Sequence, residues 1–224
     1  MALYTIGDLH LSLGAPKPMD VFGGKWVGYM DKLKEGLSVI TPEDTTVLCG
    51  DLSWAMGLEN ARADFAWIND IPGRKIILKG NHDYWWSTAG KFYKFCRENG
   101  FENLCILNNN CYEYNGWAIC GTRGWFFEEE RSGQHDAKVF NRELMRLEAS
   151  LKAAGKKEKL VFLHYPPRYR ATSAGKSSPC WSVTEPEPAI TGISTPNPTS
   201  WPSRESTAAW TTALLRRIIP ALPR

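Results

Sequence analysis

The chain has 224 residues, of which 43% are hydrophobic, and a formal net charge of +3. This length suits a single domain with a sizeable core, and the near-neutral charge argues against a protein that binds polyanions. The N-terminus lacks the basic flank and apolar stretch of a signal peptide, and no apolar run approaches the roughly 20 residues that span a bilayer. The six cysteines show no paired metal-binding spacing, so we expect buried thiols, a cytoplasmic location and no membrane attachment.

Short apolar runs rich in β-forming residues alternate with longer segments whose apolar residues recur at steps of three and four. In chain order these patterns predict a strand over 3–6, a helix over 26–40, a strand over 45–49, a helix over 58–71, a strand over 75–78, a helix over 87–98, a hairpin over 111–120, a helix over 137–154 and a strand over 159–163. The hairpin rests on the turn Asn115-Gly116 between two apolar runs. Alternating strands and helices predict an α/β fold whose sheet is covered by helices.

Four of the predicted strands end at residues that can bind metal ions. These are Asp8 with His10, then Asp51, then Asn81 with His82 and Asp83, and finally His164. A single aspartate at such a place is more often a helix cap or a turn residue. Four sets at equivalent strand ends are better explained together, because the carboxyl ends of strands converge on one crevice in open α/β sheets. We therefore expect one site built from all four.

The residue types suit a pair of divalent metal ions. Two such ions can activate a water and clamp phosphoryl oxygens during in-line displacement. Imidazole and carboxylate ligands together favour Mn, Fe or Zn over Mg or Ca. A carboxylate can bridge two cations, a neutral amide adds a ligand without excess charge, and a histidine that binds no metal can protonate a leaving alkoxide. The pattern predicts phosphate-ester chemistry.

The segments GDLH, GD and GNHD at residues 7–10, 50–51 and 80–83 resemble the calcineurin-like metallophosphoesterase superfamily. GDLSWAM, KGNHDYWW, GTRGW and LHYPP are similar to a bacterial branch of predicted phosphohydrolases, over residues 1 to about 170. The resemblance implies an α/β (α+β) fold, a sandwich of two mixed β-sheets flanked by helices. It implies these roles: Asp8 and His10 bind a first metal, Asp51 bridges both, Asn81 and His164 bind a second, His82 is the general acid, and Asp83 orients it.

Two arginines and several tryptophans stand close to these motifs. Arg123 and Arg168 could pair with substrate phosphate, because the planar guanidinium suits bidentate recognition, although a solvated or salt-bridged arginine is equally compatible. Trp54, Trp85, Trp86 and Trp125 could stack on an aromatic leaving group, but aromatic side chains more often contribute to the core.

The C-terminal quarter departs from the family. A further strand there should end in Gly-His-x-His, yet residues 171–224 contain no His, Asp, Tyr or Phe and hold eight of the fourteen prolines. We expect a metallophosphoesterase domain over 1–170 that is incomplete, with C-terminal strands missing, followed by a tail over 171–224 that does not belong to the family. By composition this tail resembles a disordered segment.

The genetic code offers a second explanation of the tail. Codons permitted for residues 190–195 (Ile-Thr-Gly-Ile-Ser-Thr) can be regrouped in another frame to read His-Gly-His-Leu-His, the missing motif. We therefore interpret the C-terminus as frameshifted after about residue 170, with a genuinely divergent disordered tail as the alternative.

Three functions remain open from the sequence. The first is a metal-dependent phosphohydrolase, acting on a phosphorylated small molecule through two metal ions, manganese among the candidates, and impaired in this copy. The second is a non-catalytic protein that binds metal or phosphate after losing ligands. The third is a nuclease-type phosphodiesterase, against which the near-neutral charge and the lack of a basic stripe argue.

Overall fold

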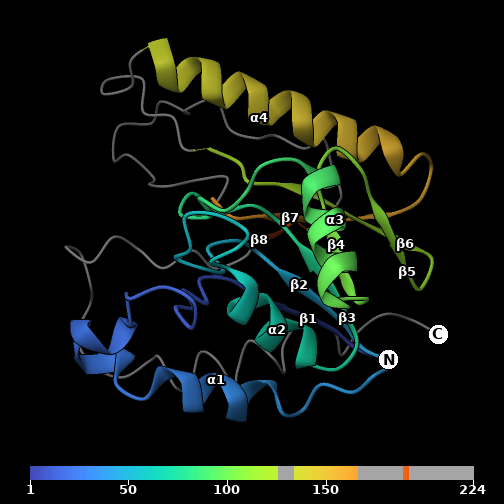
Figure 1. Cartoon of the computed structure of the whole chain (residues 1–224). Helices are drawn as coiled ribbons and strands as arrows, with labels where there is room; N and C mark the ends of the chain where they lie inside the picture. Colours follow the sequence, from blue (N-terminus) through green and yellow to red (C-terminus); the bar gives the residue numbers. More distant parts are fainter. Residues whose placement is uncertain (126–133, 166–188, 192–224) are drawn as a thin grey trace.

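The computed structural model describes residues 1–125, 134–165 and 189–191 of the chain, and Figure 1 shows their arrangement. Within these residues there are two four-stranded sheets. The first contains β1 (Leu3–Ile6), β2 (Thr45–Leu48), β3 (Arg74–Ile77) and β4 (Leu104–Ile106), in that order and all parallel. The second contains β5 (Tyr112–Tyr114), β6 (Trp117–Thr122), β7 (Lys159–Leu163) and β8 (Ala189–Thr191). Only the β5–β6 pair is antiparallel, so the second sheet is mixed.

Helices cover the outer faces of the two sheets. They are α1 (Tyr29–Leu37), α2 (Arg62–Asp70), α3 (Ala89–Asn99) and α4 (Gln134–Ala153), with 3₁₀ turns η1 (Met19–Phe22) and η2 (Gly24–Trp26) before α1. In Figure 1, α4 lies across the second sheet, while α1 and α2 lie on the far side of the first sheet. Helical crossovers between successive strands explain why the first sheet is parallel, whereas a hairpin turn makes β5 and β6 antiparallel.

Three apolar layers hold this sandwich together. Val47, Ile76 and Phe162 belong to the cluster between the two sheets. Phe65 and Phe92, from α2 and α3, pack in the cluster that covers the other face of the first sheet. Smaller clusters seat α4 on the second sheet. The predicted sandwich of two sheets flanked by helices is confirmed, with the first sheet parallel rather than mixed in its described part.

The predicted hairpin is confirmed in detail. Asn115 and Gly116 adopt φ values of 48° and 84°, and β5 pairs with β6 through Tyr114 opposite Trp117. Positive φ at both central residues is the geometry that favours an Asn-Gly turn, because its twist matches that of the strands.

The helix predicted over 26–40 is shorter than expected. Gly28 has a φ of 63°, in the left-handed region, so the α-helix begins only at Tyr29 and Trp26 ends a separate 3₁₀ turn. The helices expected over 58–71, 87–98 and 137–154 are found with shifted ends. Strand β4 was not predicted, because its three residues are too few to show a pattern.

Strand β8 lies in the segment that was expected to add no strand. Ala189–Thr191 pairs in parallel with Val161–Leu163 of β7. The physical reason is that an uncovered strand edge presents unpaired backbone groups to which any short extended segment can bond. The remaining residues of the predicted tail lie outside the described part. No helix among the described residues is long and apolar enough to cross a membrane.

Candidate metal centre

The candidate ligands after β1 and β2 are brought together by backbone pairing that continues past the strands. The amide of Asp8 donates to the Gly50 carbonyl at 2.9 Å, and the amide of His10 donates to the Asp51 carbonyl at 2.9 Å. The two loops therefore run side by side, and the side chains of Asp8 and His10 lie beside that of Asp51. The expectation that these strand ends share one crevice is confirmed by this arrangement.

Three of the candidate ligands have left-handed backbone conformations. The φ values are 55° at Asp8, 45° at His10 and 54° at Asp51. Residues with a Cβ avoid this region, at a cost of about 1–3 kcal/mol each, and such residues gather at functional sites. The surrounding structure must therefore hold these three residues in place.

Asp83 supplies much of that support. Its buried carboxylate accepts hydrogen bonds from the backbone amides of Asp51 (2.8 Å), Leu52 (2.8 Å) and Gly80 (2.6 Å), and from Trp85 Nε1 (2.9 Å). Burial and the nearby charge of Asp51 raise the pKa of Asp83, while the hydrogen bonds act in the opposite direction. Asp83 thus joins the loop after β2 to the loop after β3.

The pairing expected between Asp83 and the His82 ring is not found. Both Asp83 oxygens face the donors of the loops, and the ring nitrogen Nδ1 of His82 lies 3.2 Å from the Tyr84 hydroxyl instead. The reason is the number of buried amides in these loops, each of which needs an acceptor.

Two glycines allow these loops to touch. A Cβ at Gly50, whose φ is 90°, would lie 2.5 Å from the backbone nitrogen of Gly80. A Cβ at Gly80 would overlap the Oδ1 atom of Asp51. A side chain at Gly80 would therefore displace the Asp51 carboxylate, and one at Gly50 would separate the loop after β2 from the loop after β3.

The predicted ligands form one compact group. Asp8, Asp51 and His164 each offer a ligand atom within 4.8 Å of the others. His10 Nε2 lies 3.6 Å from Asp8 Oδ1 and 4.0 Å from Asp51 Oδ2. His164 Nε2 lies 3.7 Å from Asp51 Oδ1, so the two oxygens of Asp51 face different histidines.

His164 and Asn81 point acceptor atoms at each other. His164 Nδ1 lies 2.8 Å from the Cys49 carbonyl, which can only accept, so Nδ1 carries the proton. That leaves Nε2 as an acceptor, 2.8 Å from Asn81 Oδ1. Two facing acceptors are reconciled either by a metal ion between them or by a rotation of the Asn81 amide that brings its NH₂ group to Nε2. A carbonyl bond at Nδ1 is the usual support of a metal-binding histidine.

A further acceptor in this group lacks a donor. Asp8 Oδ2 is buried, and among the described residues it has no hydrogen-bond partner. A buried carboxylate oxygen without a donor is costly unless a cation compensates it. The donor set of carboxylates, imidazoles and one amide oxygen therefore fits divalent metal ions.

His82 lies beside this group rather than in it. Its ring centroid is 6.0 Å from that of His10 and 4.9 Å from that of Trp54, and its backbone amide donates to Asp51 Oδ1 at 2.8 Å. Burial lowers the pKa of His82, the charge of Asp51 raises it, and the neighbouring His10 and Lys17 lower it further. The ring is thus close enough to act on a group bound at the ligands without being one of them.

The structure describes only one of the two arginines that were predicted to bind substrate phosphate. Arg123 forms an ion pair with the buried Glu143 at 3.3 Å and lies 4.8 Å from the Trp125 ring, which matches the salt-bridged alternative. Arg168 lies outside the described residues.

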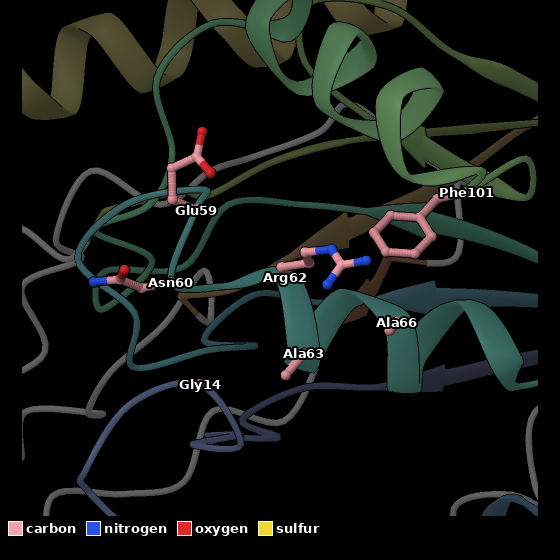
Figure 2. Close-up of a pocket in the computed structure, with 7 residues that line it drawn as sticks. All are labelled: Gly14, Glu59, Asn60, Arg62, Ala63, Ala66 and Phe101. Atoms are coloured by element: carbon pink, nitrogen blue, oxygen red, sulfur yellow. The ribbon is translucent and has the colours of Figure 1, made fainter.

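Two hollows lie near the start of α2. Figure 2 shows the larger, about 420 Å³, with Arg62 and Phe101 extending alongside each other and Asn60 in the loop ahead of the helix. It contains none of the candidate ligands. The other, about 330 Å³, is lined partly by Lys17, Trp54 and Tyr84 and borders the group.

Sequence reasoning missed some residues of this region. Lys17 and Asp64 were not predicted as site residues, because an isolated charged residue belongs to no recognisable spacing pattern. Trp54 was interpreted as more compatible with the core than with a site, yet its ring stacks on His10 with centroids 4.8 Å apart. Its place within GDLSWAM, three residues after Asp51, was the one available signal.

A family model and several solved structures are similar to this chain. The family model described as calcineurin-like phosphoesterase matches residues 1–189. Among solved structures, the chain is similar to the protein of unknown function AQ665 from Aquifex aeolicus, at 21% identity over 78% of this chain and 84% of that one, with a TM-score of 0.43. It is also similar to the phosphopantetheinyl hydrolase PptH from Mycobacterium tuberculosis, at 14% identity over 73% of this chain and 68% of that one, with a TM-score of 0.43. No curated protein matches the chain. Because the family model spans most of the chain and the fold agrees, the protein belongs to the calcineurin-like phosphoesterase family.

Proposed function

We propose that this protein hydrolyses phosphate monoesters or diesters of small molecules through a centre of two divalent metal ions, and that the chain as written is impaired. Membership of the family supports metal-dependent hydrolysis of phosphate esters in general. The number of ions, the roles of single residues, the impairment and a cytoplasmic location are our proposals.

The position of Asp51 carries the proposal of two ions. Its Oδ2 atom faces His10 at 4.0 Å, and its Oδ1 atom faces His164 at 3.7 Å. Asp8 Oδ1 lies 3.6 Å from His10 Nε2, and Asp8 also offers a ligand atom within 4.8 Å of His164, while Asn81 Oδ1 lies 2.8 Å from His164 Nε2. One carboxylate between two sets of ligands is what a bridging role requires, because its negative charge offsets the repulsion between two cations.

The ligand set favours Mn, Fe or Zn. Divalent ions held there would supply an activated water and positive charge for the phosphoryl oxygens. The protein's own contribution is to fix the ligands before any ion arrives, through the left-handed backbone of Asp8, His10 and Asp51 and the hydrogen bonds of Asp83.

His82 is proposed as the proton donor. When the oxygen of water bonds to phosphorus, the bond from phosphorus to the leaving oxygen breaks, and that oxygen needs a proton. His82 lies next to the ligands, and its Nδ1 contact with the Tyr84 hydroxyl directs Nε2 elsewhere. General acid catalysis of this kind contributes about 10²–10⁴-fold to rate. Arg123 could still reach a phosphate, although its pair with Glu143 favours a structural role.

The proposed impairment follows from the sequence of the tail. Residues 171–224 contain no histidine that could complete the ligand sets. The family model extends to residue 189, beyond the expected end near residue 170 and short of the regrouped codons 190–195. We keep the proposal that a frameshift replaced the native C-terminus, and a nucleotide sequence across codons 165–175 would test it directly.

Asp51→Asn provides the test of the metal centre. In a chain with the frame-restored C-terminus, we expect metal content, measured by elemental analysis after equilibration with Mn²⁺, to fall sharply, and turnover of 4-nitrophenyl phosphate to fall with it. Asp31→Asn makes the same chemical change at an exposed position in α1 and should alter neither. Unchanged metal content in Asp51→Asn would rule out the bridging role.

A second candidate function is metal or phosphate binding without catalysis. The missing histidines favour it, because three protein ligands can still hold one ion. Stoichiometric binding of one ion, with no turnover of either 4-nitrophenyl phosphate or its bis ester, would select this alternative.

A further inference from the structure

The smaller hollow adjoins the candidate centre through two aromatic side chains. Trp54 and Tyr84 line it, and each of them also contacts His82, with ring centroids at 4.9 Å for Trp54 and the hydroxyl at 3.2 Å from Nδ1 for Tyr84. A molecule whose phosphate lay at the ligands would thus extend past His82 into this hollow. The part of the substrate that departs with the proton from His82 would occupy it.

Trp54 is a fixed wall of the hollow. One edge of its indole is held by a hydrogen bond from Nε1 to Met19 Sδ at 3.2 Å, and its ring stacks on His10 at an interplanar angle of 18°. The Nζ atom of Lys17 lies 3.3 Å from the ring centroid, a cation–π contact. The ammonium group of Lys17, an exposed residue, therefore lies over the indole ring.

The loop that carries Lys17 is fastened to the same region. The buried carboxylate of Asp64 accepts a hydrogen bond from the backbone amide of Leu13 at 2.7 Å and another from the hydroxyl of Ser53, the neighbour of Trp54. Gly14 packs so closely on the Asn60 carbonyl that a Cβ there would overlap it. Asp64 thus fixes the distance between the Lys17 loop and Trp54.

The lining of the hollow selects for charge and shape. Lys17 supplies a positive charge, and none of the described residues that line the hollow carries a carboxylate. Met56 and Tyr84 are 71% and 51% exposed, although both are large apolar side chains beside a functional site. Because both side chains line the hollow, they give it an apolar face against which a flat group can pack.

We propose that Lys17, Trp54, Met56 and Tyr84 form the leaving-group subsite, and that it takes a flat ring bearing a negative charge. The ring packs against Met56 and Tyr84, and the anionic substituent pairs with Lys17. This assignment rests on the proposed function for its place in the reaction, but the subsite itself can bind a leaving group without metal or turnover.

The test uses two pairs of probes that differ by one carboxylate. Phenol and 4-hydroxybenzoate report on the subsite alone, through ligand-observed NMR with the full chain. Phenyl phosphate and 4-carboxyphenyl phosphate, with Mn²⁺ added, report on KM and kcat. Lys17→Met keeps the apolar stem over Trp54 and removes the charge, Lys17→Glu reverses the charge, and Lys94→Met removes an exposed lysine from α3 as the matched control.

We expect the chain to prefer 4-hydroxybenzoate over phenol, and Lys17→Met to reduce this preference about three- to fivefold, the size of an exposed ion pair. Lys17→Glu should reverse the preference, added salt should weaken it, and Lys94→Met should leave it unchanged. In turnover, the same change should appear in KM rather than kcat, since the carboxylate is bound equally in the ground and transition states.

The outcomes separate the two proposals. The subsite is overturned if Lys17→Glu still prefers 4-hydroxybenzoate over phenol. It is also overturned if Lys17→Met weakens the binding of phenol and 4-hydroxybenzoate equally. Turnover of both phosphates with no preference for the carboxylate also overturns the subsite and leaves the hydrolase function standing. Lys17-dependent binding of 4-hydroxybenzoate without turnover of either phosphate supports the subsite, and it counts against the hydrolase function only when a chain with the frame-restored C-terminus also fails to turn over both phosphates.

Discussion

Replacing Asp83 by Asn tests whether this residue holds the candidate centre together. The carboxylate accepts two hydrogen bonds at each oxygen, from Asp51 and Gly80 at Oδ2 and from Leu52 and Trp85 at Oδ1. An asparagine amide keeps one of these oxygens and replaces the other by an NH₂ group. Whichever way the amide turns, two buried N–H donors then face another donor.

The magnitude follows from those two lost bonds. A hydrogen bond to a charged group contributes about 1.5–3 kcal/mol, so Asp83→Asn should lower the free energy of unfolding by about 3–6 kcal/mol. A domain of ordinary stability has only about 5–15 kcal/mol in total. For a chain of this size the loss corresponds to a decrease of roughly 6–24 °C in Tm.

The assay is urea unfolding of the metal-free protein, followed by far-UV circular dichroism, with EDTA present so that lost metal binding does not contribute. Asp31→Asn, which makes the same change at an exposed site in α1, should cost less than about 1 kcal/mol. If the free energy of unfolding of Asp83→Asn lies within about 1 kcal/mol of that of the parent chain, the four hydrogen bonds do not hold the loops together.

Three further predictions concern proton donation, loop packing and the tail. In a chain with the frame-restored C-terminus, His82→Ala should retain its metal content but lose about 10²–10⁴-fold in rate, less for leaving groups of low pKa. An equal loss for all leaving groups would argue against proton donation. Gly80→Ala should weaken Mn²⁺ binding and cost about 1–3 kcal/mol in urea unfolding, because its Cβ overlaps Asp51 Oδ1, whereas Gly90→Ala, which meets open space, should do neither. The 224-residue chain should be poorly soluble or bind little metal, and it should show little aryl phosphatase activity. A chain that joins residues 1–170 to the frame-restored C-terminus should recover metal binding and turnover. Full activity with two bound ions in the chain as written would contradict the frameshift.

The sequence predicted those parts of the fold that depend on local chemistry. The strand ends carrying Asp8, Asp51 and His164 were correctly placed, since a short apolar run followed by a polar residue, after a glycine in the first two cases, is a local signal. The Asn115-Gly116 hairpin was equally local. The convergence of Asp8 and Asp51 was predictable as well, because both follow parallel strands of one sheet. His164 follows a strand of the second sheet, so its place beside them depends on how the two sheets pack.

What could not be predicted depends on contacts between distant residues. The hydrogen bonds of Asp83 reach 31 and 32 residues back along the chain, so only the folded loops reveal them. The bond between Asp64 and the Leu13 amide spans 51 residues. The late start of α1 is a different case. The prediction followed the helical periodicity across 26–40 and gave no weight to the glycine at position 28. The left-handed conformation of that glycine prevents the helix from starting earlier.

The left-handed backbone of Asp8, His10 and Asp51 bears on how this chain would respond to selection. Glycine adopts such φ values without steric cost, so replacing any of the three by glycine relieves strain even as it removes a ligand. A library sorted only for thermal resistance or expression should therefore accumulate glycine or asparagine at positions 8, 10 and 51. A library sorted for catalysis should reject the same changes, because we propose that these three residues bind the metal ions even though their backbone conformation costs stability.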